Sequence, residues 1–366
     1  MNNYRTVLEI DGSALEHNLN YFKQKLRPTT KILAVVKAFG YGSDGAKVAS
    51  FLADKVDYFA VAFAEEGIAL RNEGVKSPIL VLHPQLATLE EIVSYCLEPS
   101  LYSLKILDAF LEVSGKNNLR NYPIHIKFNT GLNRLGFLPT DIPEILERIK
   151  ESNKLKITSV FSHLAASEDE NELDFTLNQI NTFTQISEQF YKHLEEPPMM
   201  HLLNTSGVVN YPEAQFDMVR IGLGLYGFGN DKQETAQLKN THHLTSVISQ
   251  IHFIAPGQTV GYNRAFLAVN PTKTATIPIG HADGISRRLG KQNYEVIINK
   301  QKAPIIGNVC MDMIMVDVTK IACKEGDQVI IFNSQEMILE MAEKAGTISY
   351  EILTGISQRV KRFVRI

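Results

Sequence analysis

AVVKAFGYG, at residues 34–42, joins an apolar run to a lysine and then to a glycine-spaced turn that carries Tyr41. The run 31–36 (KILAVV) is apolar after its first residue, which predicts a strand buried on both faces within a parallel sheet. Lys37 would then lie at the rim of a core, where burial lowers the pKa of a lysine and frees its amine for a Schiff base with a carbonyl compound. At this point a lysine that extends from the strand end into solvent is an equal alternative.

Length, charge and cysteine content exclude several classes of protein. The 366 residues, 44% of them hydrophobic, suffice for one large domain and a smaller one, or for two of ordinary size. A net charge of -3, with no basic stripe interleaved with aromatics, argues against nucleic acid as a partner. No apolar run approaches the roughly 20 residues that span a bilayer, and no signal-peptide pattern opens the chain, so we expect a cytoplasmic protein without a membrane partner. The three cysteines lack CxxC spacing, and we expect neither disulfides nor a metal.

Short apolar runs alternate with amphipathic segments through the first two thirds of the chain. The predicted strands are 32–37, 58–63, 78–83, 99–103, 124–129, 157–163, 201–204 and 218–222. Helical patterns such as 64–71, 89–93 and 172–194 lie between them. This alternation predicts a closed, TIM-like (β/α)8 barrel over residues 11–235. An open doubly wound sheet is the competing architecture, which the absence of a GxGxxG helix start disfavours.

After residue 235 the pattern changes to strands rich in β-branched residues and separated by tight turns. The predicted strands are 247–254, 275–279, 294–298, 313–318 and 328–332. One helix, 334–344, interrupts them, with Ser334 as its N-cap. We therefore predict an α/β protein whose barrel is followed by an all-β domain over residues 236–366, which the N-terminal strand within residues 1–10 could join.

Polar side chains recur at the ends of the predicted barrel strands, where barrel enzymes place their chemistry. They are Lys37, Arg134, His163, the run Asn204-Thr205-Ser206, and Arg220. Each alone has a structural explanation, as a core histidine, half of a buried ion pair or an N-cap cluster. Together, however, so many polar groups at the edge of a core would cost too much free energy for a merely structural rim. The hydroxyls of 205–206 and the amides of 222–224 suit a phosphate. A phosphate cradle beside a Schiff-base lysine suggests pyridoxal 5′-phosphate (PLP), with a Schiff-base aldolase of a sugar phosphate as the alternative.

Several ordered motifs span the chain: VVKA and YG within 35–42, NTG and RLG within 129–136, FSH (161–163), NTS (204–206), VRIG (219–222), VGY (260–262), IPIGHADG (277–284) and GNVCMD (307–312). Through these segments the chain resembles the alanine racemase family over nearly its full length. The resemblance implies a PLP-binding barrel with a C-terminal β domain, and a homodimer whose active site is shared between its subunits.

The resemblance also implies two bases, because racemisation removes a proton from one face of Cα and returns it to the other. Lys37 would form the Schiff base with PLP and serve one face, and a Tyr262 contributed by the second subunit would serve the other. A phenol with a pKa of about 10 is a poor base at neutral pH unless its phenolate is stabilised. The family places a histidine, here His163, near that tyrosine and links it to an arginine, here Arg220.

An arginine facing the pyridine nitrogen is the most discriminating of the implied features. Most PLP enzymes place a carboxylate there, which keeps the nitrogen protonated. An arginine cannot accept that proton, so racemisation is favoured over transamination. The other implied cofactor contacts are Tyr41, Asn204, Thr205, Gly222 and Leu223; Arg134 and Met311 would hold the substrate; and Lys127, carbamylated in many members, His281 and Asp312 would support the site.

Three positions depart from the family pattern: Asn129 replaces an aspartate, His281 a tyrosine at the substrate entry, and Gln358 a tyrosine that touches the phosphate. None removes an implied base. The resemblance implies an alanine racemase that supplies D-alanine for peptidoglycan. The alternatives are a racemase of another small amino acid such as serine, a fold-related PLP-dependent decarboxylase, and a PLP-binding carrier without turnover.

Overall fold

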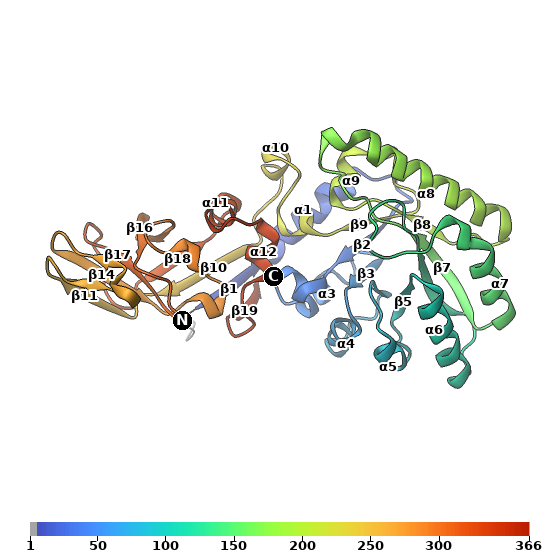
Figure 1. The fold of residues 1–366 in the computed structure, drawn as a ribbon, viewed down its shortest axis with the longest axis horizontal. Coiled ribbons are helices and arrows are strands. Elements are labelled where there is room, and N and C mark those ends of the chain that lie inside the picture. The colour runs from blue at the N-terminus through green and yellow to red at the C-terminus, as the bar shows by residue number, and fades with distance from the viewer. Residues whose placement is uncertain (1–5, 366) are drawn as a thin grey trace.

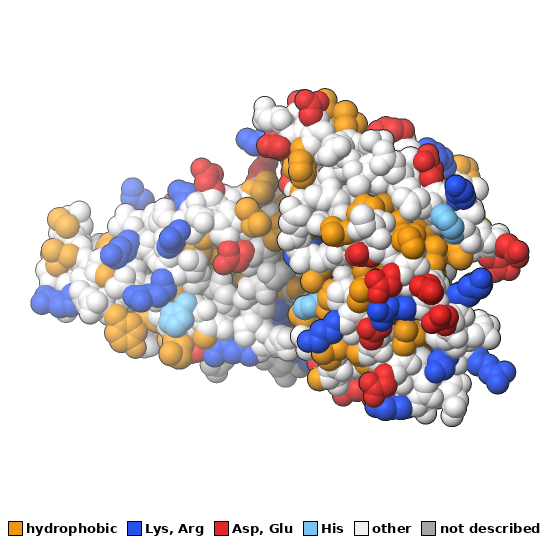
Figure 2. Space-filling model, turned by 45° about the vertical axis from the view of Figure 1, so that its right-hand side comes forward, with side chains coloured by type: hydrophobic (Ala, Val, Ile, Leu, Met, Phe, Trp, Pro, Cys, Tyr) orange, Lys and Arg blue, Asp and Glu red, His pale blue; other side chains and the backbone are white. Residues whose placement is uncertain are grey.

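The computed structural model describes residues 6–365, and Figure 1 shows two parts arranged along one long axis. A closed barrel, β2 to β9, lies at one end, and a nine-stranded sheet extends away from it. The predicted fold class, a barrel followed by an all-β domain, is thus confirmed. The predicted domain boundary between residues 235 and 236 stays a prediction. Acidic and basic side chains are intermixed on the face drawn in Figure 2. Within the described residues, no helix has the length and apolar composition needed to cross a membrane.

The barrel contains every predicted strand, but each strand ends earlier than expected. The strands are β2 (Lys31–Val35), β3 (Tyr58–Val61), β4 (Ile79–Val81), β5 (Glu98–Leu101), β6 (Tyr122–Lys127), β7 (Leu155–Phe161), β8 (Met199–His201) and β9 (Met218–Ile221). Lys37 therefore begins α2 (Lys37–Tyr41) and does not end a strand. The apolar pattern continues past the last ladder hydrogen bonds because the loop residues still pack on the core: Val36 is 1% exposed.

Helices cover the outside of the barrel (Figure 1). They are α1 (Gly12–Lys23), α3 (Gly45–Leu52), α4 (Ala64–Asn72), α5 (Leu89–Ser94), α6 (Leu104–Lys116), α7 (Ile142–Ser152), α8 (Leu173–His193) and α9 (Thr205–Asn210). The short helix α10 (Lys232–Thr235) follows the barrel and is drawn above α11 and α12. The helix predicted at 172–194 is α8, whose apolar stripe buries Phe183, Ile186 and Phe190 against the strands.

The second sheet has the strand order β11-β14-β17-β16-β15-β18-β10-β1-β19. Its strands are β1 (Val7–Asp11), β10 (His242–Val247), β11 (Gln250–Ile254), β14 (Thr272–Ile277), β15 (Glu295–Ile298), β16 (Gln301–Ile306), β17 (Ile314–Asp317), β18 (Gln328–Phe332) and β19 (Lys361–Arg365). A separate pair, β12 (Thr259–Val260) and β13 (Phe266–Leu267), and two helices, α11 (Gln335–Ala345) and α12 (Ser349–Thr354), complete this part. Ser334 caps α11 as predicted, because its side chain accepts a hydrogen bond from Met337 N.

The sequence patterns missed several of these elements. The strand predicted at 247–254 is instead β11, preceded by a turn and by the end of β10. Pro304 in β16 argues against a strand on sequence grounds, yet β16 pairs with both β15 and β17. The strand β19 and the helix α12 were also not predicted.

The N-terminal strand ties the two parts together. Strand β1 lies between β10 and β19, with Val7 opposite Thr245 in the antiparallel pair and opposite Lys361 in the parallel pair. The chain then enters α1 directly, where Asp11 caps the helix by accepting a hydrogen bond from Ala14 N. The end of the second sheet is thereby held against the side of the barrel.

Candidate active site

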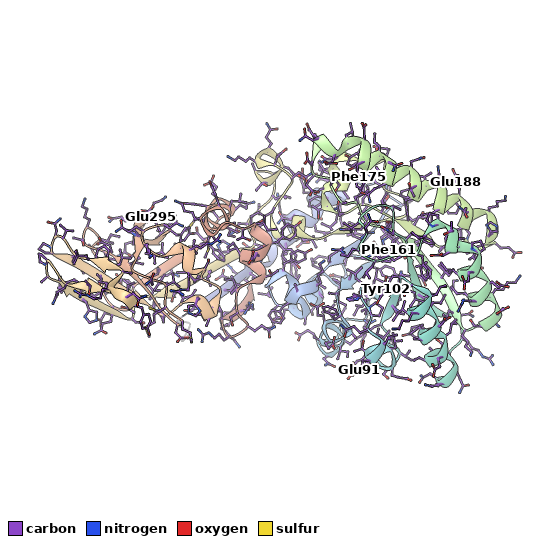
Figure 3. The ribbon with its side chains drawn as sticks, in the orientation of Figure 1. Glu91, Tyr102, Phe161, Phe175, Glu188 and Glu295 are labelled. Carbon is purple, nitrogen blue, oxygen red and sulfur yellow. The ribbon has the colours of Figure 1, made fainter. Side chains whose placement is uncertain are left out.

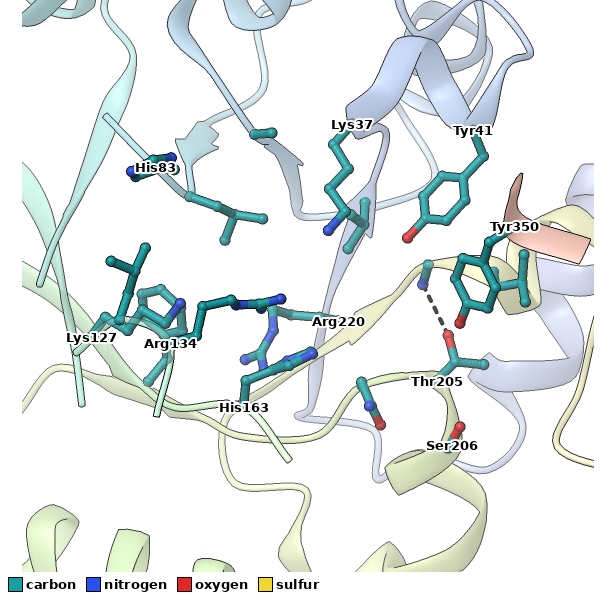
Figure 4. Close-up of a pocket in the computed structure, with 18 of the residues that line it drawn as sticks. Lys37, Tyr41, His83, Lys127, Arg134, His163, Thr205, Ser206, Arg220 and Tyr350 are labelled. Carbon is teal, nitrogen blue, oxygen red and sulfur yellow. Dashed lines mark hydrogen bonds between the residues drawn. The ribbon is translucent and has the colours of Figure 1, made fainter. Parts of the chain in front are cut away.

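A cavity of about 490 Å³ opens at the ends of the barrel strands. Figure 4 shows its side chains converging from several loops, and Figure 3 marks Phe161, another lining residue, within the barrel. The cavity brings together every barrel residue with a predicted site role: Lys37, Tyr41, Lys127, Arg134, His163, Asn204, Thr205, Arg220, Gly222 and Leu223. The carboxyl ends of parallel strands meet at one face of a barrel, so residues far apart in sequence share this site.

A left-handed turn presents Lys37 to the cavity. Ala38 and Gly40 have φ angles of 53° and 63°, and this region is costly for residues other than glycine. Glu66 of α4 holds the turn: its Oε1 accepts a hydrogen bond from Ala38 N at 2.6 Å, and its Oε2 accepts one from Ala62 N at 2.7 Å. One carboxylate therefore joins the loops that follow β2 and β3 and sets the direction in which Lys37 leaves the backbone.

The surroundings of Lys37 favour a neutral amine. Burial lowers the pKa of Lys37, and the positive charges of Arg134 and Arg220 lower it further, while Glu66 opposes them. A lysine with a lowered pKa is a better nucleophile toward a carbonyl group at neutral pH. Figure 4 shows the amine among the side chains that line the cavity, in line with the Schiff-base interpretation.

One end of the cavity forms a cradle for a small anion. Thr205 Oγ1 accepts a hydrogen bond from Gly222 N at 3.0 Å (Figure 4). A Cβ at Gly222 would lie 2.6 Å from Tyr41 Oη, so the backbone approaches the phenol only because residue 222 has no side chain. Burial raises the pKa of Tyr41, which keeps its hydroxyl a neutral donor. The hydroxyl and the close backbone suit the phosphate of PLP.

Arg220 forms the floor of the cavity. Its Nη1 donates to His201 Nδ1 at 2.7 Å, and its Nη2 donates to the carbonyl oxygens of Ser162 and Leu202 at 2.6 and 2.7 Å. His163 Nδ1 lies 3.1 Å from Nη2. Burial lowers the pKa of Arg220 to about 9, so the guanidinium stays protonated at neutral pH. Within residues 6–365, Nε has no hydrogen-bond partner and remains a donor for a ring nitrogen.

The charges around the cavity call for an anionic occupant. Lys127 is 6% exposed, and no carboxylate of the described residues forms an ion pair with it. Burial, followed by the charges of Arg134, Arg220 and Lys37, lowers its pKa to about 8. Burial and Arg220 also lower the pKa of His163 well below its usual value, which keeps that imidazole neutral. A cofactor with a phosphate and a phenolic oxygen, together with a substrate carboxylate, would supply the missing negative charge.

Tyr350 and His83 line the same cavity but were missed by the sequence reasoning. The ring of Tyr350, in α12, lies 6.0 Å from that of Tyr41, beside the anion cradle (Figure 4). Gln358, where the resemblance places a tyrosine at the phosphate, is exposed and does not line the cavity. His83 follows β4 and could have been found by the same strand-end rule as the others, whereas nothing local marks Tyr350.

The predicted site residues of the β domain do not line this cavity: Tyr262, His281, Met311 and Asp312. Tyr262 and Met311 are 71% and 59% exposed. Their loops pack together, since Asn308 Nδ2 donates to Tyr262 O at 3.0 Å and His281 N donates to Cys310 O at 2.9 Å. Asp312 pairs with Arg359. These residues form one surface of the β domain, separate from the cavity of their own chain.

Known proteins match this chain from end to end. The family model described as alanine racemase, N-terminal domain, matches residues 10–229, and the one for the C-terminal domain matches residues 241–364. Alanine racemase 1 of Caldanaerobacter subterraneus is 34% identical, covering 98% of this chain and 94% of that protein. The alanine racemase of Thermodesulfovibrio yellowstonii is 36% identical, covering 97% and 96%.

Solved structures of alanine racemases are also similar to this chain over its full length. An alanine racemase of Clostridium difficile 630 superposes with a TM-score of 0.94 at 30% identity, covering 100% of this chain and 97% of that one. The alanine racemase of Bacillus anthracis with bound L-Ala-P gives 0.91 at 28% identity, covering 100% and 96%. Matched along its whole length in sequence and in structure, this chain belongs to the alanine racemase family.

Proposed function

We propose that the protein interconverts L-alanine and D-alanine with PLP as its cofactor. One observation carries the proposal: the same cavity holds a half-buried lysine of lowered pKa, Lys37, and an arginine, Arg220, where most PLP enzymes have a carboxylate. A cation that only donates hydrogen bonds cannot accept one from a protonated ring nitrogen, so it would keep that nitrogen unprotonated, and this disfavours transamination relative to racemisation.

The residues that would hold PLP come from the whole mouth of the barrel. Lys37 would bind its aldehyde carbon, Tyr41, Thr205, Gly222 and Leu223 its phosphate, and Arg220 its ring nitrogen. Asn204 caps α9 beneath Thr205 by accepting a hydrogen bond from Gly207 N and so fixes that loop. When bound, PLP supplies a ring that withdraws electrons and acidifies the α-hydrogen of an amino acid.

Protons would be moved at Cα by two groups on opposite faces. Lys37 holds or releases a proton on one face, aided by its lowered pKa. Tyr262 would act on the other face, and its exposure outside the cavity of its own chain supports a contribution from a second copy in a homodimer. His163 would assist that phenol. Arg134 in the cavity and Met311 from the second copy would hold the substrate carboxylate, with Lys127, Asp312 and His281 as supporting residues.

The cellular role follows from the reaction. D-alanine is used for cell-wall peptidoglycan, and we propose that the protein supplies it in the cytoplasm. The three cysteines are all unpaired, which supports a reducing compartment. A fold-related decarboxylase is disfavoured because those enzymes place a glutamate against the ring nitrogen, whereas the residue in this cavity that would face that nitrogen is Arg220.

Turnover on purified protein tests the proposal. Incubation of L-alanine with protein and PLP is expected to produce D-alanine, with serine and lysine as comparison substrates. Borohydride reduction is expected to abolish turnover and to fix the cofactor at Lys37, as read by peptide mass spectrometry. Release of CO₂ from a basic amino acid without racemisation of alanine would contradict the proposal.

A further inference from the structure

A row of buried polar side chains crosses the interior of the barrel. Glu98, His125, Ser159, His201 and Arg220 lie on the successive strands β5 to β9, and their exposures are 9%, 0%, 0%, 0% and 4%. Barrel interiors are usually filled by branched apolar side chains, and each buried polar group is costly unless it is hydrogen-bonded. The row therefore needs an explanation that the predicted catalytic residues do not provide.

Each member of the row hydrogen-bonds to the next. Glu98 Oε2 lies 2.7 Å from His125 Nε2, and His125 Nδ1 lies 2.6 Å from Ser159 Oγ. The same Oγ lies 2.8 Å from His201 Nε2. His201 Nδ1 then lies 2.7 Å from Arg220 Nη1. The row of hydrogen bonds is therefore unbroken from the carboxylate of Glu98 on β5 to the guanidinium of Arg220 at the floor of the cavity.

The chemistry of the two end residues fixes which atom donates and which accepts in every hydrogen bond of the row. Arg220 can only donate, so His201 Nδ1 must accept and His201 Nε2 must carry the ring proton. His201 then donates to Ser159, whose hydroxyl donates to His125 Nδ1. His125 Nε2–H donates in turn to Glu98. Every proton in the row has an acceptor, and both imidazoles are neutral.

The competing arrangement, a protonated His125 paired with Glu98, leaves a group unsatisfied. Its Nδ1–H would donate to Ser159, which already accepts from His201, and the serine hydroxyl would have no acceptor among the described residues. A buried donor without a partner is unfavourable. Burial, and with it the negative charge of Glu98, raises the pKa of Tyr58, so the Tyr58 hydroxyl stays neutral beside this carboxylate.

We propose that Glu98, His125, Ser159 and His201 are positioning residues: they form a one-directional relay that fixes the tautomer of His201 and thereby holds Arg220 as an oriented cation. The relay balances the charge of Arg220 from a distance. A carboxylate directly against the guanidinium would place a proton acceptor beside the cofactor, whereas a carboxylate beyond three intervening side chains does not reach the cavity. Phe161 completes the support, with its ring stacked 4.7 Å from that of His201.

The inference rests on the proposed function only in the contact between Arg220 and PLP, so its first test needs no turnover. Histidine side-chain 15N NMR on the full chain, with and without PLP, is expected to show His125 and His201 as neutral Nε2–H tautomers at neutral pH. An Nδ1–H tautomer or a doubly protonated ring at either position would overturn the relay. Failure to racemise alanine, by contrast, would leave this result intact.

A matched pair of variants provides the second test. Ser159→Ala breaks the middle of the row. Ser100→Ala removes the same atom from a fully buried serine opposite His125 in register, whose hydroxyl has no partner within the described residues. We expect Ser159→Ala to shift the His201 resonances and to lower kcat by at least about tenfold with little change in KM, and Ser100→Ala to do neither. Equal effects on kcat, or unchanged His201 resonances in Ser159→Ala, would contradict the relay.

Discussion

The backbone of Gly222 lies against the hydroxyl of Tyr41, with only 2.6 Å between Tyr41 Oη and the position that a Cβ at residue 222 would take. Residue 222 therefore has no room for a side chain while Tyr41 keeps its place. The contact joins the turn after Lys37 to the loop after β9, and so joins the proposed attachment point of the cofactor to its phosphate cradle.

Gly222→Ala should weaken PLP binding by displacing the phenol. We expect Kd for PLP, measured by fluorescence titration, to rise by about tenfold, or about 1.4 kcal/mol. Tyr41→Phe removes the clashing oxygen and serves as the background control. In that background Gly222→Ala should cost much less, and an equal cost in both backgrounds would show that the close contact does not matter.

The reactivity of Lys37 should follow its lowered pKa. An amine is nucleophilic only when neutral, so a lower pKa moves Schiff-base formation to lower pH. Absorbance-monitored binding of PLP to cofactor-free protein should therefore rise with pH around a midpoint below 10.5, the ordinary value. A midpoint at or above that value would mean that the amine is in contact with solvent.

Glu66→Gln should shift that midpoint further down, because the carboxylate raises the pKa of Lys37. It should also lower the free energy of unfolding by about 2 kcal/mol, since an amide cannot accept as many backbone hydrogen bonds as the carboxylate does. Glu65→Gln changes the exposed neighbour of Glu66 on α4 and should alter neither quantity. An upward shift in Glu66→Gln would contradict the assigned electrostatics.

Lys127 should carry a carbamate. With a pKa of about 8, about a tenth of its amine is neutral at pH 7, a far larger share than for an ordinary lysine, and only a neutral amine adds CO₂. The product is an anion among cations, which removes an unfavourable cluster of positive charge. Labelling with 13C-bicarbonate should give one carbamate signal in NMR that Lys127→Ala abolishes. A signal that persists in Lys127→Ala would assign the carbamate elsewhere.

Two inactive variants should restore activity when mixed. If Tyr262 acts in trans, a hybrid dimer of Lys37→Ala and Tyr262→Phe chains holds one intact site and one doubly altered site. Denaturing and refolding the variants together in equal amounts should recover about a quarter of the unaltered activity, because half of the dimers are hybrids with one working site each. Refolding each variant alone provides the control, and no recovery in the mixture would place Tyr262 in the site of its own chain.

The barrel was predictable because each of its strands is a short apolar run between amphipathic helices, and this periodicity is local in the chain. Strand ends were less predictable, since apolar packing continues into loops such as the one at Val36 after the ladder has ended. In the second sheet, β16 was not predicted, and it contains Pro304, a residue that is unusual inside a strand. The structure tolerates it there within a pairing that local pattern cannot reveal.

The same difference between local and long-range information decides which site residues could be predicted. Lys37, His163 and Arg220 could be found because polar groups at or just after the carboxyl ends of buried strands are rare and share one face of a barrel. Tyr350 could not, because it reaches the cavity from a short helix far away in sequence. The relay residues His125 and Ser159 lie inside strands β6 and β7, and nothing local in the sequence shows that they meet.

By itself, the sequence determined the barrel, the lysine and arginine at its mouth, and the family, because these depend on local periodicity and on motifs. Only the tertiary structure decided that Gly222 touches Tyr41, that Glu98 is linked to Arg220 through three buried side chains, and that Tyr262 lies outside its own cavity. The physical reason is that such contacts depend on strand register and barrel closure, which are properties of the whole chain.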